Sequence, residues 1–121
     1  PSTALSHKLA AWNERRLLRD LYDCYYLAAR AGASPDPGIL DQRLSKIESR
    51  LPKLKGTRRM SRSQLADALR EAAEDLTDAD LEKELAGLLP AEELAGLAIR
   101  IRTAVTGLAD VIESDQFQPH P

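Results

Sequence analysis

The chain has 121 residues, of which 43% are hydrophobic and 30% are charged, and its formal net charge is −2. This length and balance fit one folded domain and exclude a long disordered chain or one embedded throughout in a membrane. The near-neutral charge argues against nucleic-acid binding over the whole surface, but it leaves room for a local basic patch.

The cysteine content favours a reducing compartment. Cys24 is the only cysteine, so it cannot form an internal disulfide. No apolar run approaches the roughly 20 residues that a membrane-spanning helix needs, and the first residues lack the pattern of a signal peptide. We therefore expect a soluble, cytoplasmic domain with no membrane contact.

Helical periodicity dominates the sequence. Leu, Ala, Glu and Arg recur at helical spacing, sustained apolar–polar alternation is missing, and Phe occurs only once. We predict an all-α fold, a compact bundle of five to six helices that forms a single domain over residues 1–115.

Two helices are expected in the N-terminal part. The first begins near Ser2 or Thr3 and runs to about Asn13. The second runs from about Arg16 to Arg30. Its apolar stripe consists of Leu17, Leu18, Leu21, Cys24, Tyr25 and Ala28. Its opposite, polar face carries Arg16, Arg19, Asp20, Asp23 and Arg30.

A turn leads into the third helix. Gly32 and the Ser34–Gly38 segment end the second helix, and Asp36 with Pro37 has the pattern of an N-cap followed by the first helical position. The third helix is expected to run to about Leu51. Its buried stripe is Leu40, Leu44, Ile47 and Leu51. Proline disfavours helical geometry in the preceding residue, so Pro52 predicts a loop over residues 52–60.

A capping box marks the start of the fourth helix. Ser61 and Gln64 have the required spacing, in which each side chain bonds the backbone N–H of the other residue. This helix should run to about Glu74. Its buried stripe is Leu65, Leu69 and Ala72.

Two further helices and a tail complete the chain. Thr77 is expected to cap a short helix from Asp78 to about Leu88, with Leu81 and Leu85 inward. A last helix over residues 91–113 should form the spine of the bundle. Its apolar stripe is Leu94, Leu97, Ala98, Ile101, Val105, Leu108 and Ile112. Residues 116–121 are predicted to be a disordered tail.

The stretch LSHKLAAWNERRLLRDLYDCYYL is the strongest functional signal, because it combines cations and carboxylates at helical spacing. As a pattern it is Leu5-x₂-Lys8-x₂-Ala11-x₃-Arg15-x₄-Asp20-x₂-Asp23. On helices, Lys8 and Arg15 share one face, and Asp20 and Asp23 project together. A lysine can neutralise phosphate charge during nucleotidyl transfer, while carboxylates orient it or accept a proton.

This pattern resembles the third conserved motif of the AbiEii-type abortive-infection nucleotidyltransferase toxins, a branch of the polymerase-β-like superfamily. The six residues fill every position of that motif, within the N-terminal quarter of the chain. The resemblance implies a toxin or phage-defence effector that transfers a nucleotide from an NTP to an acceptor, with RNA as a candidate acceptor and an antitoxin protein as partner. It implies Lys8, Asp20 and Asp23 as catalytic residues, and Lys8 and Arg15 as nucleotide- or phosphate-binding residues.

In that family, Mg²⁺ is held by a Gly-Ser turn followed by an Asp-x-Asp pair in an N-terminal α/β domain. No such element is found in this sequence. The resemblance therefore implies the C-terminal helical part of a longer nucleotidyltransferase. The missing domain would be the main binding site for Mg²⁺ and would complete the active site. This chain alone is expected to be inactive.

A structural interpretation of the same residues stays open. Arg16 with Asp20, and Arg19 with Asp23, are spaced as i,i+4 helical ion pairs, each of which contributes only about 0.3–0.5 kcal/mol. Such pairs do not require Lys8. The contrasting hypothesis is a stand-alone, non-catalytic helical module that binds a protein or RNA.

A basic stretch without an acidic residue forms the second feature. It consists of Arg50, Lys53, Lys55, Arg58, Arg59 and Arg62. Phosphate backbone is the natural partner of such a stretch, so Arg58, Arg59 and Arg62 are candidate nucleic-acid contacts. The alternative is a solvated charged surface.

The remaining reactive side chains are expected to be structural. His7 and His120 have no Cys or His at ligand spacing, so no metal site is expected in this chain. Cys24 lacks a histidine partner and should pack. The aromatic residues are packing residues first and candidate base contacts second: Trp12, Tyr22, Tyr25 and Tyr26.

Overall fold

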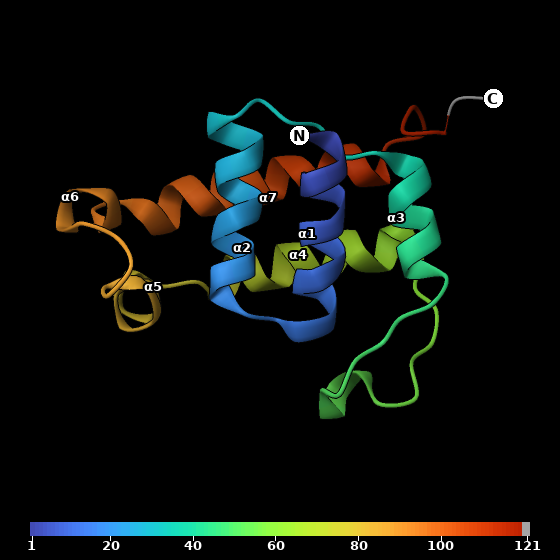
Figure 1. The fold of residues 1–121 in the computed structure, drawn as a ribbon, viewed down its shortest axis with the longest axis horizontal. Coiled ribbons are helices and arrows are strands. Elements are labelled where there is room, and N and C mark those ends of the chain that lie inside the picture. Colours follow the sequence, from blue (N-terminus) through green and yellow to red (C-terminus); the bar gives the residue numbers. More distant parts are fainter. Residues whose placement is uncertain (120–121) are drawn as a thin grey trace.

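The structure is a computed structural model that describes residues 1–119. Within that range the chain forms seven α-helices, one π-helical segment and one 3₁₀ segment, with no strand (Figure 1). The α-helices are α1 (Ser2–Arg15), α2 (Leu18–Tyr25), α3 (Pro37–Leu44), α4 (Arg62–Asp75), α5 (Asp78–Leu85), α6 (Ala91–Leu94) and α7 (Leu97–Glu113). The π-helical segment η1 is Tyr26–Arg30 and the 3₁₀ segment η2 is Pro52–Leu54. The predicted all-α bundle is confirmed, with more helices than expected.

The bundle has two layers. Helices α4 and α7 run side by side, and α1 and α2 cross over them as an antiparallel pair (Figure 1). Helix α3 packs against α1, while α5 and α6 lie together at the other end of the molecule (Figure 1). The segment between α3 and α4, which includes η2, extends away from the bundle (Figure 1).

The core forms where the apolar stripes of these helices meet. Leu5, Leu9 and Trp12 of α1 and Leu21 of α2 are buried against α4 and α7 in one hydrophobic cluster. The predicted spine of the last helix is buried from Leu97 to Ile112, since its apolar residues recur at helical spacing. The predicted apolar stripes were wrong at some of their edge positions. Leu17 is exposed, Ala72 is half-buried, and Ala73 takes the buried position.

Three predicted helix caps are present. The Asp36 side chain accepts a hydrogen bond from the Ile39 N–H, and the Thr77 side chain accepts one from the Asp80 N–H. Ser61 and Gln64 form the complete capping box. Each cap satisfies backbone donors that a helix N-terminus leaves without an internal partner.

The third helix is shorter than predicted, because it ends at Leu44 rather than about Leu51. The backbone N–H of Ile47 donates to the Arg58 carbonyl at 2.9 Å, and the Met60 N–H donates to the Leu44 carbonyl at 3.0 Å. These long-range hydrogen bonds replace the helical ones, so the backbone leaves the helix after Leu44 and continues as a loop. Ile47 stays buried, whereas Leu51 is only half-buried.

The last predicted helix is two helices. Gly96 adopts φ +69°, a left-handed conformation that glycine tolerates, and it separates α6 from α7. The fifth helix also ends earlier than expected, at Leu85. The second begins at Leu18 and changes to π-helical geometry at Tyr26.

The predicted disorder of the tail is wrong for Phe117, which is buried with the core cluster. Its carbonyl accepts a hydrogen bond from Arg62, whose guanidinium also lies over the phenyl ring, 5.1 Å from the centroid. The prediction for residues 120 and 121, including His120, lies outside the described residues. None of the helices within residues 1–119 has both the length and the hydropathy needed to cross a membrane.

Candidate functional site

The site begins with the turn that reverses the chain between α1 and α2. Arg16 ends α1 with φ 56°, and it is the one non-glycine residue with positive φ among residues 1–119. Its guanidinium donates hydrogen bonds to the backbone carbonyl and side-chain oxygen of Asn13, and it lies over the ring of Trp12. Leu17 is then extended and occupies the N-cap position of α2, without a side-chain hydrogen bond to the helix. This turn places α1 and α2 side by side with their charged faces adjoining.

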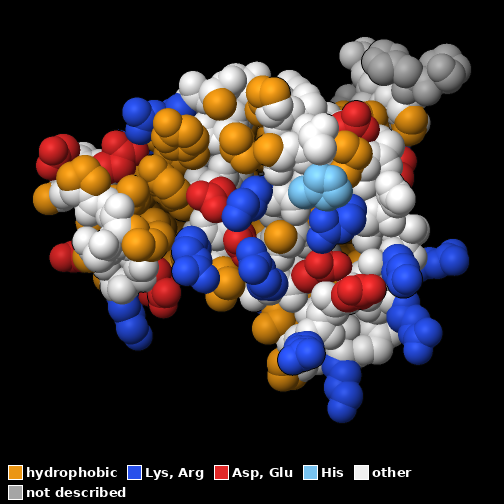
Figure 2. Space-filling view, in the orientation of Figure 1, with side chains coloured by type: hydrophobic (Ala, Val, Ile, Leu, Met, Phe, Trp, Pro, Cys, Tyr) orange, Lys and Arg blue, Asp and Glu red, His pale blue; other side chains and the backbone are white. Residues whose placement is uncertain are grey.

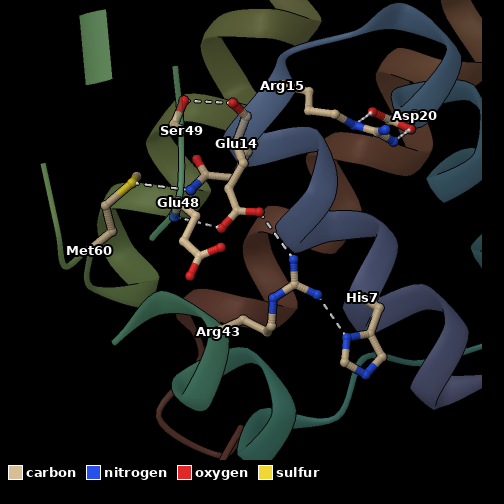
Figure 3. A network of polar contacts seen from close by, with 9 residues as sticks. His7, Glu14, Arg15, Asp20, Arg43, Glu48, Ser49 and Met60 are labelled. Atoms are coloured by element: carbon tan, nitrogen blue, oxygen red, sulfur yellow. Dashed lines mark hydrogen bonds and ion pairs between the residues drawn. The ribbon is translucent and has the colours of Figure 1, made fainter. Parts of the chain in front are cut away.

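Four charged residues of the N-terminal pattern meet across α1 and α2. The Lys8 Nζ lies 2.8 Å from Asp23 Oδ2 and 3.5 Å from Asp20 Oδ1. The Arg15 guanidinium donates two hydrogen bonds to the Asp20 carboxylate, at 3.0 Å and 2.6 Å (Figure 3). The pattern therefore forms one cluster in space, which we call the α1–α2 charge cluster: Lys8, Arg15, Asp20 and Asp23.

The expected i,i+4 pairs are not formed within the described part of the chain. Arg16 lies on the turn and bonds Asn13, so no helical register connects it with Asp20. Asp23 pairs with Lys8 rather than with Arg19. Asp20 was placed on the polar face, yet it is only 1% exposed, because α1 covers it and supplies its partners.

Burial separates the roles of the two carboxylates. Both Asp20 oxygens accept from Arg15, and one of them also contacts Lys8. The side chains of Lys8 and Asp23 are 38% and 39% exposed, so these two can approach a ligand. Hydrogen bonding to Asp23 raises the pKa of Lys8, which keeps the ammonium charged at neutral pH. Asp20 and Arg15 thus hold Lys8 and Asp23 in place.

The other two residues of the pattern take part in packing. Leu5 is completely buried in the core, and Ala11 is half-buried on α1. The charge cluster contains two cations and two anions in direct contact. It is therefore neutral as a whole, and an anionic ligand would be held by the exposed parts of Lys8 and Arg15.

The cluster does not fit a resident Mg²⁺ ion. Residues 1–119 contain no group of three or more His, Cys, Asp or Glu side chains that could hold a metal. The two carboxylates present are neutralised by Lys8 and Arg15, which leaves little charge to attract a divalent cation.

The prediction that Cys24 packs is confirmed. It is completely buried, and burial raises the pKa of its thiol to about 12. At neutral pH this thiol is protonated and is therefore a poor nucleophile. Trp12 and Tyr25 are buried as well, while Tyr22 is half-buried and Tyr26 is exposed.

A second polar network, which sequence reasoning did not identify, centres on Glu14 (Figure 3). Its carboxylate accepts from Arg43 at 3.1 Å and from the Glu48 N–H at 3.0 Å, and its backbone carbonyl accepts from the Ser49 hydroxyl at 2.7 Å. The Arg43 guanidinium also lies 2.8 Å from Nδ1 of His7. This network ties the start of the 45–60 loop to α1. Its partners are far apart in the sequence, so no local pattern could have shown it.

The basic stretch divides into two kinds of residue. Arg62 forms a bidentate pair with Asp41, with hydrogen bonds of 2.7 Å and 2.6 Å, and also bonds Phe117. It is therefore a poor candidate for a nucleic-acid contact. The other members of the stretch are exposed on the projecting loop: Arg50, Lys53, Lys55, Arg58 and Arg59. Lys46, which lies outside the predicted stretch, is exposed there too.

Comparisons with known proteins give no relative. No protein-family model, curated protein or solved structure matches the chain.

Proposed function

We propose that this chain is the C-terminal helical part of an AbiEii-like nucleotidyltransferase, which transfers a nucleotide from an NTP to an acceptor. The observation that carries the proposal is the convergence of Lys8, Arg15, Asp20 and Asp23 from two helices. The spacing of the pattern did not require this convergence, because a helical register alone would have left Lys8 without either aspartate.

Each residue has a role that follows from its exposure. Lys8 binds the phosphates of the NTP, because its charged and partly exposed ammonium keeps donor capacity beyond its two carboxylate partners. Asp23 orients Lys8 and faces the acceptor. Asp20 is a positioning residue, since its buried carboxylate accepts both Arg15 hydrogen bonds, while the exposed part of the Arg15 guanidinium is a second phosphate donor.

The remaining parts of the proposal come from the resemblance. Mg²⁺ is bound mainly by an α/β domain outside this chain, RNA is the candidate acceptor, and an antitoxin protein is the partner. A cytoplasmic toxin or phage-defence effector agrees with a single, buried, unpaired cysteine.

The test measures transfer of labelled nucleotide by the complete protein that contains this chain. Lys8→Ala should lower the rate about 10²–10³-fold, the usual loss when one preorganised donor to a developing anion is removed. Helical content and melting temperature should stay close to those of the parent, because Lys8 is partly exposed. Lys83→Ala, which removes an exposed lysine of α5, is the matched control and should retain full activity.

Two results would overturn the proposal. One is an unchanged transfer rate in Lys8→Ala and Asp23→Asn. The other is that the complete protein, assayed with Mg²⁺ and each of the four NTPs in turn, transfers none of them.

The alternative is a non-catalytic helical module. The observation that favours it is the neutrality of the charge cluster, which also suits a purely structural tie between α1 and α2. In that case the complete protein would transfer no nucleotide, and Lys8→Ala would have no transfer activity to change.

A further inference from the structure

The loop between α3 and α4 is held in an ordered conformation by its own hydrogen bonds. We call residues 45–60 the basic finger. Its two arms are joined by the hydrogen bonds from Ile47 N–H to the Arg58 carbonyl and from Met60 N–H to the Leu44 carbonyl. At its tip, the Thr57 N–H donates to the Leu54 carbonyl at 2.9 Å, next to η2. Ile47 and Leu54 are buried, so the finger has an apolar inner side.

The finger is also anchored to the bundle. The Glu48 N–H and the Ser49 hydroxyl both bond to Glu14 of α1 (Figure 3). These contacts fix the direction in which the finger projects (Figure 1). The basic side chains are therefore presented by an ordered element, which reduces the entropy lost when they bind a partner.

Its basic side chains are unpaired. The finger carries six of them: Lys46, Arg50, Lys53, Lys55, Arg58 and Arg59. All six are exposed, and none forms an ion pair within residues 1–119. Elsewhere in the described chain, the cations that do form ion pairs are Lys8, Arg15, Arg30, Arg43, Arg62 and Arg70. The finger thus concentrates uncompensated positive charge.

The rest of the chain has the opposite charge. Glu48 is the one acidic residue of the finger, which gives this segment a net charge of +5 in a chain whose total is −2. The space-filling view shows Lys and Arg side chains around the projecting segment, with mixed charges over the rest of this face (Figure 2). A strongly anionic partner is therefore attracted to the finger and repelled by much of the remaining surface.

The side chains of the finger indicate which anion it suits. No aromatic residue occurs in residues 45–60, so the finger has no platform on which single-stranded bases could stack. The large hydrophobic side chains exposed in the described chain all lie outside it, so it has nothing to insert into a membrane. The remaining candidate partner is a regular array of phosphates, because such an array can be bound by cationic side chains alone.

We propose that the basic finger docks on the phosphate backbone of a double-helical nucleic acid without reading its base sequence. The proposal does not depend on nucleotidyl transfer and holds equally for a non-catalytic module. Arg58 and Arg59 lie on the arm that returns to α4, and Lys53 and Lys55 lie at the tip.

The magnitude follows from counterion release. Each phosphate neutralised on B-form DNA contributes about −0.9 to the slope of log K against log salt concentration, so six contacts set an upper limit of about −5. Removing two contacts should reduce the slope by about 2 and weaken binding uniformly across sequences.

The experiment measures fluorescence anisotropy of labelled duplex RNA and duplex DNA, about 20 base pairs long and of scrambled sequence, between about 50 and 200 mM salt. Arg58→Gln/Arg59→Gln should raise the Kd about tenfold or more at the lowest salt and flatten the salt slope. The matched control is Lys83→Glu, which changes the net charge by the same amount on the exposed surface of α5 and should bind as the parent does.

Several outcomes would overturn the proposal. These are no binding to either duplex at the lowest salt, equal binding by Arg58→Gln/Arg59→Gln, or an equal loss in Lys83→Glu. Tighter binding to single strands, to anionic lipid vesicles or to polyglutamate would replace the duplex with another class of partner. The duplex-binding assay contains no NTP and measures no transfer, so this test and the transfer assay can fail independently.

Discussion

Asp20→Ala tests whether the buried carboxylate holds α1 and α2 together. Asp20 is 1% exposed and accepts hydrogen bonds of 3.0 Å and 2.6 Å from Arg15, with Lys8 at 3.5 Å. The substitution removes a carboxylate that contacts both Lys8 and Arg15. Because Arg15 and Lys8 are themselves partly exposed, they regain water when the carboxylate is lost.

The expected loss follows from these contacts. Hydrogen bonds to a charged group contribute about 1.5–3 kcal/mol, and rehydration of the two cations keeps the loss near 2 kcal/mol. Asp20 also lies in the first turn of α2, where a negative charge contributes roughly 0.5 kcal/mol through the helix dipole. The free energy of unfolding should therefore fall by about 2–3 kcal/mol, which corresponds to a melting temperature about 10 °C lower for a domain of this size.

The measurement is urea unfolding followed by circular dichroism, with thermal unfolding as a second probe. Asp110→Asn is the control, because Asp110 forms a solvent-exposed pair with Arg70 on the far helices α4 and α7, and it should change little. A loss below about 1 kcal/mol for Asp20→Ala, or an equal loss in the control, would refute the positioning role assigned to Asp20.

Two further predictions concern the core. Burial raises the pKa of Cys24 to about 12, above its ordinary value of 9.0, so its contribution to stability is complete below pH 9 and is lost as pH rises toward 12. Stability should fall by up to about 1.4 kcal/mol per pH unit through this group. Chemical denaturation at several pH values should show that slope, and Cys24→Ala should lack it; an identical slope in the variant would contradict the assignment. Phe117→Ala should lower the free energy of unfolding by about 3 kcal/mol, since a buried aromatic side chain and its contact with Arg62 are lost. An unchanged urea midpoint would show that the segment after α7 contributes nothing to the core.

Local patterns determined much of the fold. The caps at Asp36, Ser61 and Thr77 were predictable because each involves a side chain and a backbone N–H within three residues. The apolar spine of α7 was predictable because helical periodicity repeats over many residues. The resemblance and the spacing also identified Lys8, Arg15, Asp20 and Asp23 as the residues to examine.

Tertiary structure alone decided where local and long-range bonds compete. The third helix could have continued past Leu44 by its own pattern, but the Ile47 N–H bonds to Arg58 and the Glu48 N–H bonds to Glu14. Likewise, the sequence pattern placed Arg62 in the exposed basic stretch, whereas in the structure it bonds Asp41 and Phe117. Such partners are distant in the sequence, so their contacts leave no periodic signal.

The charge cluster shows the same division most clearly. Helical periodicity predicted that two cations and two carboxylates lie on helical faces. Only the left-handed turn at Arg16 decided that Asp20 bonds Arg15 and Lys8 and becomes buried. The physical reason is that one backbone dihedral angle in a turn reorients a whole helix, whereas the side-chain pattern within each helix is the same for any orientation.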